Sequence, residues 1–253
     1  MNKIKKYLIL CFTITYIAWG AIAVYSQLHN VNFTEYIWMY ILYIIGVLSP
    51  AISAITIQKH IEKCTIKQSI SYIFKKPIHK SDWLLCLLGA SLFSILPYMF
   101  IGGQKLGSII NILLSLPMFF FIGGLEEVGW RGFMLENLLS NSKHSKFLSV
   151  LGLGCIWQLW HLPLFFMVGS YQEQYVSFGI HTLWTIATAF VLGALYIRSR
   201  STMMCIFAHC IINSITNVFI VNISWYEAII KLIICILVFL IVVYWKPKRM
   251  HQV

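Results

Sequence analysis

The chain has 253 residues, of which 59% are hydrophobic and only 11% are charged. Soluble domains carry about 25% charged residues, so this composition excludes an ordinary soluble protein and indicates a polytopic membrane protein. The formal net charge is +11, and the function that this charge indicates depends on where the basic residues lie.

Eight apolar stretches are long enough to cross a bilayer, which takes roughly 20 mostly apolar residues. They cover residues 7–24, 37–57, 83–101, 107–125, 147–168, 178–197, 203–222 and 228–245. The short connections between them predict an all-α fold, a bundle of about eight transmembrane helices forming one domain over residues 1–253. Residues 1–24 also resemble a secretory signal, with a basic start and an apolar core, but the apolar stretch is long enough to be a retained span.

The basic residues fall almost entirely on one side of this predicted topology. All but two of the 19 lysines and arginines lie in the two tails and in the second, fourth and sixth connections; the exceptions are Lys105 and Lys231. The positive-inside rule therefore predicts a multi-pass plasma-membrane protein with both termini in the cytoplasm. The basic excess favours contact with anionic membrane lipid, and no nucleic-acid partner is predicted.

The fourth span ends in charged residues, with Glu126 and Glu127 followed by Arg131. Each charge inside a membrane helix costs about 2.5–3.5 kcal/mol, so such residues indicate function by default. If the helix continues to about Leu138, Glu127 lies one turn from Arg131 and can pair with it. Glu126 points about 100° away, toward Trp130, which cannot neutralise it, so its carboxylate is left for chemistry. The alternative is a helix end at which both glutamates reach water.

Two further spans carry polar side chains. In the fifth, Trp157 lies one turn before His161, where its ring could hold the imidazole in place, and Pro163 can open the helix nearby. In the seventh, His209 and Asn213 share one helix face. Alternatively, these side chains only pack in the core or bond helix to helix. Polar residues at comparable depth on three spans are nevertheless expected to face one another rather than lipid.

The remaining intramembrane histidine is His181, which begins the sixth span on the external side. Histidine is ordinary at the membrane interface, so the sequence predicts no functional role for it. The other histidines lie in loops or tails.

A buried carboxylate, two imidazoles and a carboxamide suit hydrolysis of an amide bond. A carboxylate or an imidazole takes a proton from water, and hydrogen-bond donors stabilise the oxyanion that forms. Three of the same groups, Glu126, His161 and His209, could instead hold a divalent metal such as zinc with a bound water. The sequence leaves both routes open.

These residues fall into three motifs that resemble those of a known family. The segment from Glu126 to Arg131 resembles the EExxxR motif of the CPBP intramembrane proteases, the CAAX prenyl endopeptidases and bacteriocin-processing enzymes also called Abi. Trp157 and His161 resemble its FxxxH motif, with tryptophan in place of phenylalanine, and His209 and Asn213 match HxxxN. The three motifs occur in order within about residues 120–215.

The resemblance implies a helix bundle whose active site lies in the membrane and opens toward the cytoplasm. In this family's scheme Glu126 and His161 would activate water, and His209 and Asn213 would bind the oxyanion or a metal. Glu127 and Arg131 would hold the geometry of the site. The expected function is an intramembrane endopeptidase acting on a membrane-associated peptide or protein.

Two alternative functions use the same bundle. One is a non-catalytic membrane partner or immunity protein that modulates another membrane protein. The other is an ion or proton transporter using the buried carboxylates, against which the sequence shows no inverted repeat and no paired broken helices.

Overall fold

The computed structural model describes residues 3–73, 77, 79–140 and 145–244. Trp245, the last residue of the eighth predicted span, and the C-terminal tail lie outside them. The elements, in chain order, are α1 (Lys3–His29), α2 (Ile37–His60), α3 (Ile66–Ile73), α4 (Ser81–Ile101), β1 (Gly103–Lys105), α5 (Ile110–Phe119), η1 (Phe120–Gly124), η2 (Val128–Leu135), α6 (Glu136–Leu139), α7 (Lys146–Trp160), η3 (Leu162–Phe166), α8 (Tyr171–Tyr175), α9 (Phe178–Ser199), α10 (Thr202–Val218), β2 (Phe219–Val221) and α11 (Trp225–Tyr244).

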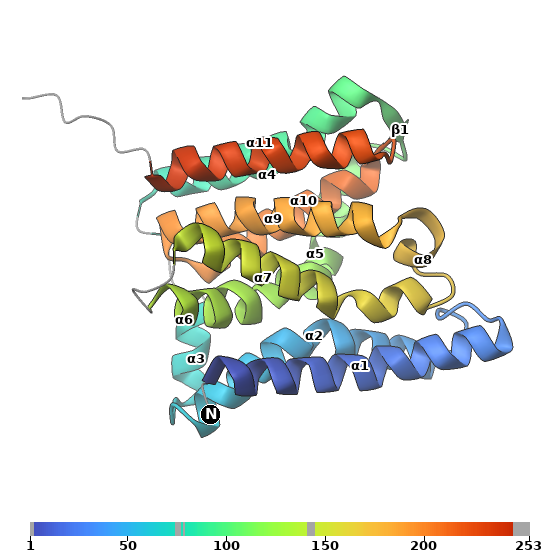
Figure 1. Cartoon of the computed structure of the whole chain (residues 1–253), viewed down its shortest axis with the longest axis horizontal. Coiled ribbons are helices and arrows are strands. Elements are labelled where there is room, and N and C mark those ends of the chain that lie inside the picture. The colour runs from blue at the N-terminus through green and yellow to red at the C-terminus, as the bar shows by residue number, and fades with distance from the viewer. Residues whose placement is uncertain (1–2, 74–76, 78, 141–144, 245–253) are drawn as a thin grey trace, which may run out of the picture.

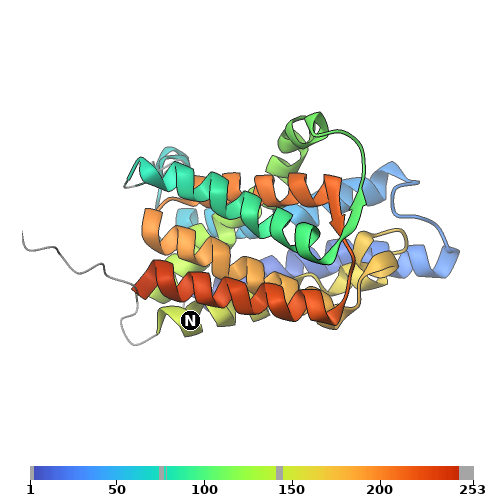
Figure 2. The ribbon, with the colours of Figure 1, turned by 90° about the horizontal axis from the view of Figure 1, so that it is seen from above.

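The long helices lie side by side along one axis of the molecule, from α1 and α2 at one edge to α4 and α11 at the other (Figure 1). α1 packs on α2, α9 packs on both α7 and α11, and α10 packs on α4 and α5. α9 and α10 therefore contribute much of the buried core. α5 stands away from this row (Figure 2), and none of its ten residues is buried.

Within the described residues, six helices are long and apolar enough to span a membrane, and the bent pair 110–124 and 128–139 makes a seventh candidate. α10 is a further apolar helix of 17 residues. These segments follow the eight predicted spans in order, so the prediction of an all-α membrane bundle is confirmed. α10 is shorter than the predicted span 203–222 because β2 begins at Phe219.

The predicted continuous helix from the fourth span to about Leu138 is wrong. The backbone leaves the helical region at Ile122 (φ −103°, ψ 92°) and Gly123 (φ 110°, ψ −57°), and the two helical parts meet at 43°. A φ of +110° strains any residue that has a Cβ, and glycine adopts it freely. Glu126 and Glu127 therefore lie at the start of a new helical part, where the helix dipole favours negative charge.

Large apolar side chains cover the outer faces of the helices. Ile17 is 69% exposed, Leu114 71% and Phe100 83%. Soluble proteins rarely expose apolar patches of such extent, whereas a bilayer matches them.

Polar side chains bond the helices to one another inside the bundle. The indole Nε1 of Trp160 in α7 donates to Thr15 of α1 at 2.6 Å and to Ser49 of α2 at 3.1 Å. Interhelical bonds of this kind are typical of membrane bundles. They attach the helix that precedes His161 to the first two helices.

A two-stranded antiparallel sheet, which the sequence analysis did not predict, lies at the end of the bundle opposite the N-terminus (Figure 1). Gly103 pairs with Val221, and Lys105 pairs with Phe219. The sheet joins the connection after α4 to the end of α10, so both strands border the same end of the bundle as α8.

Candidate active site

A buried carboxylate with an arginine and a histidine as partners lies where η2 meets α10. Glu127 Oε1 accepts a hydrogen bond from Arg131 Nη1 at 2.8 Å and lies 2.9 Å from His209 Nδ1. All three side chains are buried. The Glu127–Arg131 pair predicted from the four-residue spacing is confirmed, and the structure adds His209 from a helix that lies 82 positions further along the chain.

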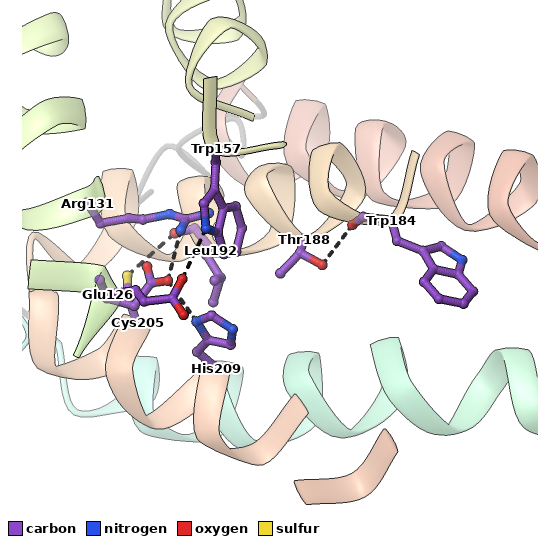
Figure 3. Close-up of polar contacts among 9 residues, drawn as sticks. Glu126, Arg131, Trp157, Trp184, Thr188, Leu192, Cys205 and His209 are labelled. Carbon is purple, nitrogen blue, oxygen red and sulfur yellow. Dashed lines mark hydrogen bonds and ion pairs between the residues drawn. The ribbon is translucent and has the colours of Figure 1, made fainter. Parts of the chain in front are cut away.

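Glu126 is buried beside this group, and its partner comes from α7. The indole Nε1 of Trp157 donates to Glu126 Oε2 at 3.1 Å (Figure 3). The same indole ring lies 4.4 Å from the Arg131 guanidinium carbon and makes an edge contact with the His209 ring. Trp157 thus bonds Glu126 directly and contacts Arg131, the partner of Glu127, through its ring. The sequence did not predict these contacts. The signal was available, because a buried indole N–H usually finds an acceptor.

His161 lies where α7 ends and the η3 turn begins. Its Nδ1 lies 2.9 Å from the carbonyl oxygen of Trp157. A carbonyl only accepts, so Nδ1 carries the proton, and Nε2 of the neutral ring keeps its lone pair. The backbone of Trp157 therefore orients this imidazole, in addition to the ring contact predicted from the spacing. The predicted opening of the helix near Pro163 is confirmed.

His181, which the sequence analysis set aside as interfacial, lies beside His161. The two ring centroids are 5.1 Å apart, in an edge-to-face arrangement. His181 Nδ1 lies 2.7 Å from Gln158 Oε1, and Thr185 donates to the same oxygen at 2.9 Å. The position of His181 along its predicted span could not reveal the contact with His161, because that contact depends on how α9 packs against α7.

A cavity of about 400 Å³ brings the motif residues together. His161, His209, Asn213 and Trp157 all line it, and His181 lines it as well. Glu126 is not among the lining residues. Because Glu126 is bonded to Trp157, its carboxylate lies directly behind this part of the cavity wall.

Gly123 allows the backbone to approach the same residues closely. A Cβ at this position would lie 2.5 Å from Asn213 Nδ2 and 3.2 Å from His209 Nε2. The break in the fourth span therefore lies against the HxxxN pair, and both His209 and Asn213 face it.

An ion pair of α11 also lines the cavity. Glu227 is buried, and its Oε1 lies 3.4 Å from Lys231 Nζ. Trp184 donates to the other carboxylate oxygen of Glu227, and Lys231 lies over the rings of Phe93 and Trp184. Figure 3 shows Trp184 and Thr188 well along α9 from the group around Glu126.

The predicted metal ligands Glu126, His161 and His209 do not form a metal site as arranged. Among the described residues no three His, Cys, Asp or Glu side chains gather closely enough to hold an ion. The physical reason lies in their partners. Trp157 bonds Glu126 and contacts both imidazole rings, with ring centroids 5.6 Å from His161 and 5.5 Å from His209.

Comparison with known proteins agrees with the three motifs. Residues 108–215 match the model of the type II CAAX prenyl endopeptidase Rce1-like family. The chain is also similar to CAAX prenyl protease 2 of Methanococcus maripaludis, with 28% identity over 231 residues, covering 83% of this chain and 82% of that protein. Glu126, His161, His209 and Asn213 all lie within the matched residues. In these residues the chain is thus similar to the CAAX prenyl endopeptidases, a group of the CPBP intramembrane proteases.

Proposed function

We propose that this protein is an intramembrane endopeptidase that hydrolyses a peptide bond of a membrane-associated peptide or protein. One observation carries the proposal: a buried carboxylate, Glu126, lies behind the wall of a cavity lined by His161, His209 and Asn213. In this proposal the whole chain acts as a single membrane-embedded domain in contact with lipid, with no nucleic-acid partner, and both termini lie in the cytoplasm.

Water activation falls to Glu126 and His161. Glu126 accepts a proton from a water molecule that enters beside Trp157, and the His161 Nε2 lone pair accepts a hydrogen bond from the same water. The water oxygen forms a bond to the carbonyl carbon of the substrate, and the carbonyl oxygen becomes an oxyanion. The proton then passes to the amide nitrogen as the carbon–nitrogen bond breaks.

Oxyanion stabilisation falls to the HxxxN pair. The Nδ1–H of a protonated His209 donates to Glu127, and its Nε2–H is then free to donate to the oxyanion in the cavity. Asn213 adds the N–H groups of its carboxamide. Donors held in place before the reaction stabilise the developing charge without reorganising. Glu127 and Arg131 keep His209 in this orientation. In this proposal the residues act without a metal, because Glu126, His161 and His209 are not arranged to bind one.

The test is cleavage by the purified protein in detergent or liposomes. The substrates are membrane-associated peptides: prenylated and unprenylated C-terminal tails, and bacteriocin-like peptides, read out by mass spectrometry. Cleavage that is lost in Glu126→Gln and retained with a chelator supports the proposal. Sensitivity to the chelator would overturn the metal-free route, and absence of cleavage in every class of peptide would overturn the proposed activity.

Replacing Trp157 with phenylalanine is expected to lower kcat about tenfold or more. Phenylalanine restores the family's motif residue and keeps an aromatic ring near Arg131, but it removes the hydrogen bond to Glu126. A hydrogen bond to a charged group contributes about 1.5–3 kcal/mol, and about 1.4 kcal/mol corresponds to tenfold in rate. Steady-state kinetics on a cleaved peptide measures the change.

The matched control for this change is Trp160→Phe, which removes an indole N–H from the same helix. Trp160 bonds Thr15 and Ser49. Its ring also lies against His161, a contact that the phenyl ring of the variant retains. The variant is expected to lower thermal stability and to leave kcat close to that of the unchanged protein. Equal losses of kcat in the two variants would show that the Glu126 bond has no special role.

Replacing Gly123 with alanine is expected to abolish cleavage and to destabilise the protein by about 1–3 kcal/mol. The added Cβ meets Asn213 and His209, and φ at this position is +110°. Gly152→Ala is the control, because apart from the nearby backbone of α7 itself no atom lies within 4 Å of its Cβ position. Removing a mid-helix glycine is expected to stabilise the protein by about 0.5–1 kcal/mol. Activity and the thermal unfolding midpoint in detergent measure both, and an active Gly123→Ala would contradict the tight approach.

A further inference from the structure

The N-terminal end of the bundle is closed behind the two glutamates. All eight residues of η2, from Val128 to Leu135, are buried. Ser199, the last residue of α9, and Thr202, the first of α10, are also buried, and Thr202 lies against Gly132 of η2. Among the described residues, the protein on this side of Glu126 is therefore tightly packed.

The cavity extends the other way. Its lining continues from His209 to Tyr171 of α8 and to the three residues of β2. It also includes Asn217, whose side chain is exposed. These elements lie at the end of the bundle opposite the N-terminus (Figure 1). The site is thus reached from the end that carries the sheet and α8.

The charges of the chain distinguish these two ends. At the closed end, Lys3 pairs with Glu62 at 2.6 Å. The basic N-terminal tail and the basic second connection therefore lie together there. Lys105 and Lys231 lie at the open end. They are the two basic residues that belong neither to the tails nor to the second, fourth and sixth connections. By the positive-inside rule, the closed end is cytoplasmic.

We propose that the cavity opens to the non-cytoplasmic face of the membrane, so that the substrate is a peptide segment presented on that side. The proposal rests on the proposed function and adds the side of access. It reverses the cytoplasmic opening that the family resemblance implied, because this chain's packed end and its basic end coincide. The chemistry of the lining selects a largely apolar segment: aromatic rings such as those of Phe93, Phe119 and Trp184 surround one neutralised ion pair.

Thiol labelling tests the side of access without requiring activity. Five native cysteines are buried, Cys155 is exposed, and Cys64 is partly exposed at the closed end. The protein used carries Cys155→Ser and Asn217→Cys, which leaves one accessible thiol at each end. Spheroplasts of an expressing bacterial host are treated with a membrane-impermeant sulfonated maleimide before and after permeabilisation, and mass spectrometry maps the label.

The expected result is labelling of the Asn217→Cys thiol in intact spheroplasts, with labelling of Cys64 only after permeabilisation. Labelling of Cys64 in intact spheroplasts, or an Asn217→Cys thiol that needs permeabilisation, overturns the proposal.

Sealed vesicles test the same inference with substrate. A peptide found to be cleaved in detergent is made membrane-impermeant with a charged tag and added outside right-side-out and inverted vesicles. Right-side-out vesicles are expected to cleave it, and inverted vesicles only after detergent is added. Cleavage confined to sealed inverted vesicles overturns the side of access while leaving the protease proposal intact, whereas a chain with no protease activity fails already in detergent.

Discussion

Glu126→Gln is expected to lower kcat by about 10²- to 10⁴-fold, the usual contribution of a general base. Glutamine has nearly the same shape and can still accept the Trp157 hydrogen bond, but it cannot take a proton from water. KM is expected to change little, because Glu126 lies behind the cavity wall and not among its lining residues. Steady-state kinetics on a cleaved peptide measures both constants.

Glu136→Gln provides the matched control for this prediction. Glu136 lies outside the cavity lining and pairs with Arg200 at 2.9 Å at a partly exposed position. Exposed ion pairs contribute about 0–1 kcal/mol, so this variant is expected to fold and to cleave normally. If Glu126→Gln kept full activity while folding normally, another group would have to activate the water.

Arg131→Met is expected to destabilise the protein by about 3–5 kcal/mol, the cost of removing one partner from a buried ion pair. The buried carboxylate of Glu127 would keep only His209 as a partner. The stacking of the guanidinium on Trp157 would also be lost. The unfolding midpoint in detergent is expected to fall sharply, and activity to fall with it.

The double variant Glu127→Gln with Arg131→Met separates charge from packing. Removing both charges leaves no unpaired buried carboxylate, so much of the lost stability is expected to return. Activity is not expected to return, because His209 loses the carboxylate that orients it. A double variant no more stable than Arg131→Met would mean that Arg131 stabilises the site through packing alone.

The sequence by itself was sufficient for features that depend on composition and on neighbours along one helix. The low charge content and the apolar stretches predicted the membrane bundle. The four-residue spacing predicted the Glu127–Arg131 pair, because side chains one turn apart on a helix lie close together whatever surrounds them. The motif spacing predicted that polar residues of separate helices face one another, and the structure brings His161, His209 and Asn213 to one cavity.

The tertiary structure decided everything that depends on how separate helices are rotated and packed. The bond from Trp157 to Glu126 joins residues 31 positions apart, and the place of His181 beside His161 depends on how α9 packs on α7. The break at Gly123 occurs where α10 approaches the backbone too closely for a side chain. Many helix rotations bury an apolar face equally well, so the apolar pattern could not choose among them, and only the packed bundle determined which end of the cavity is open.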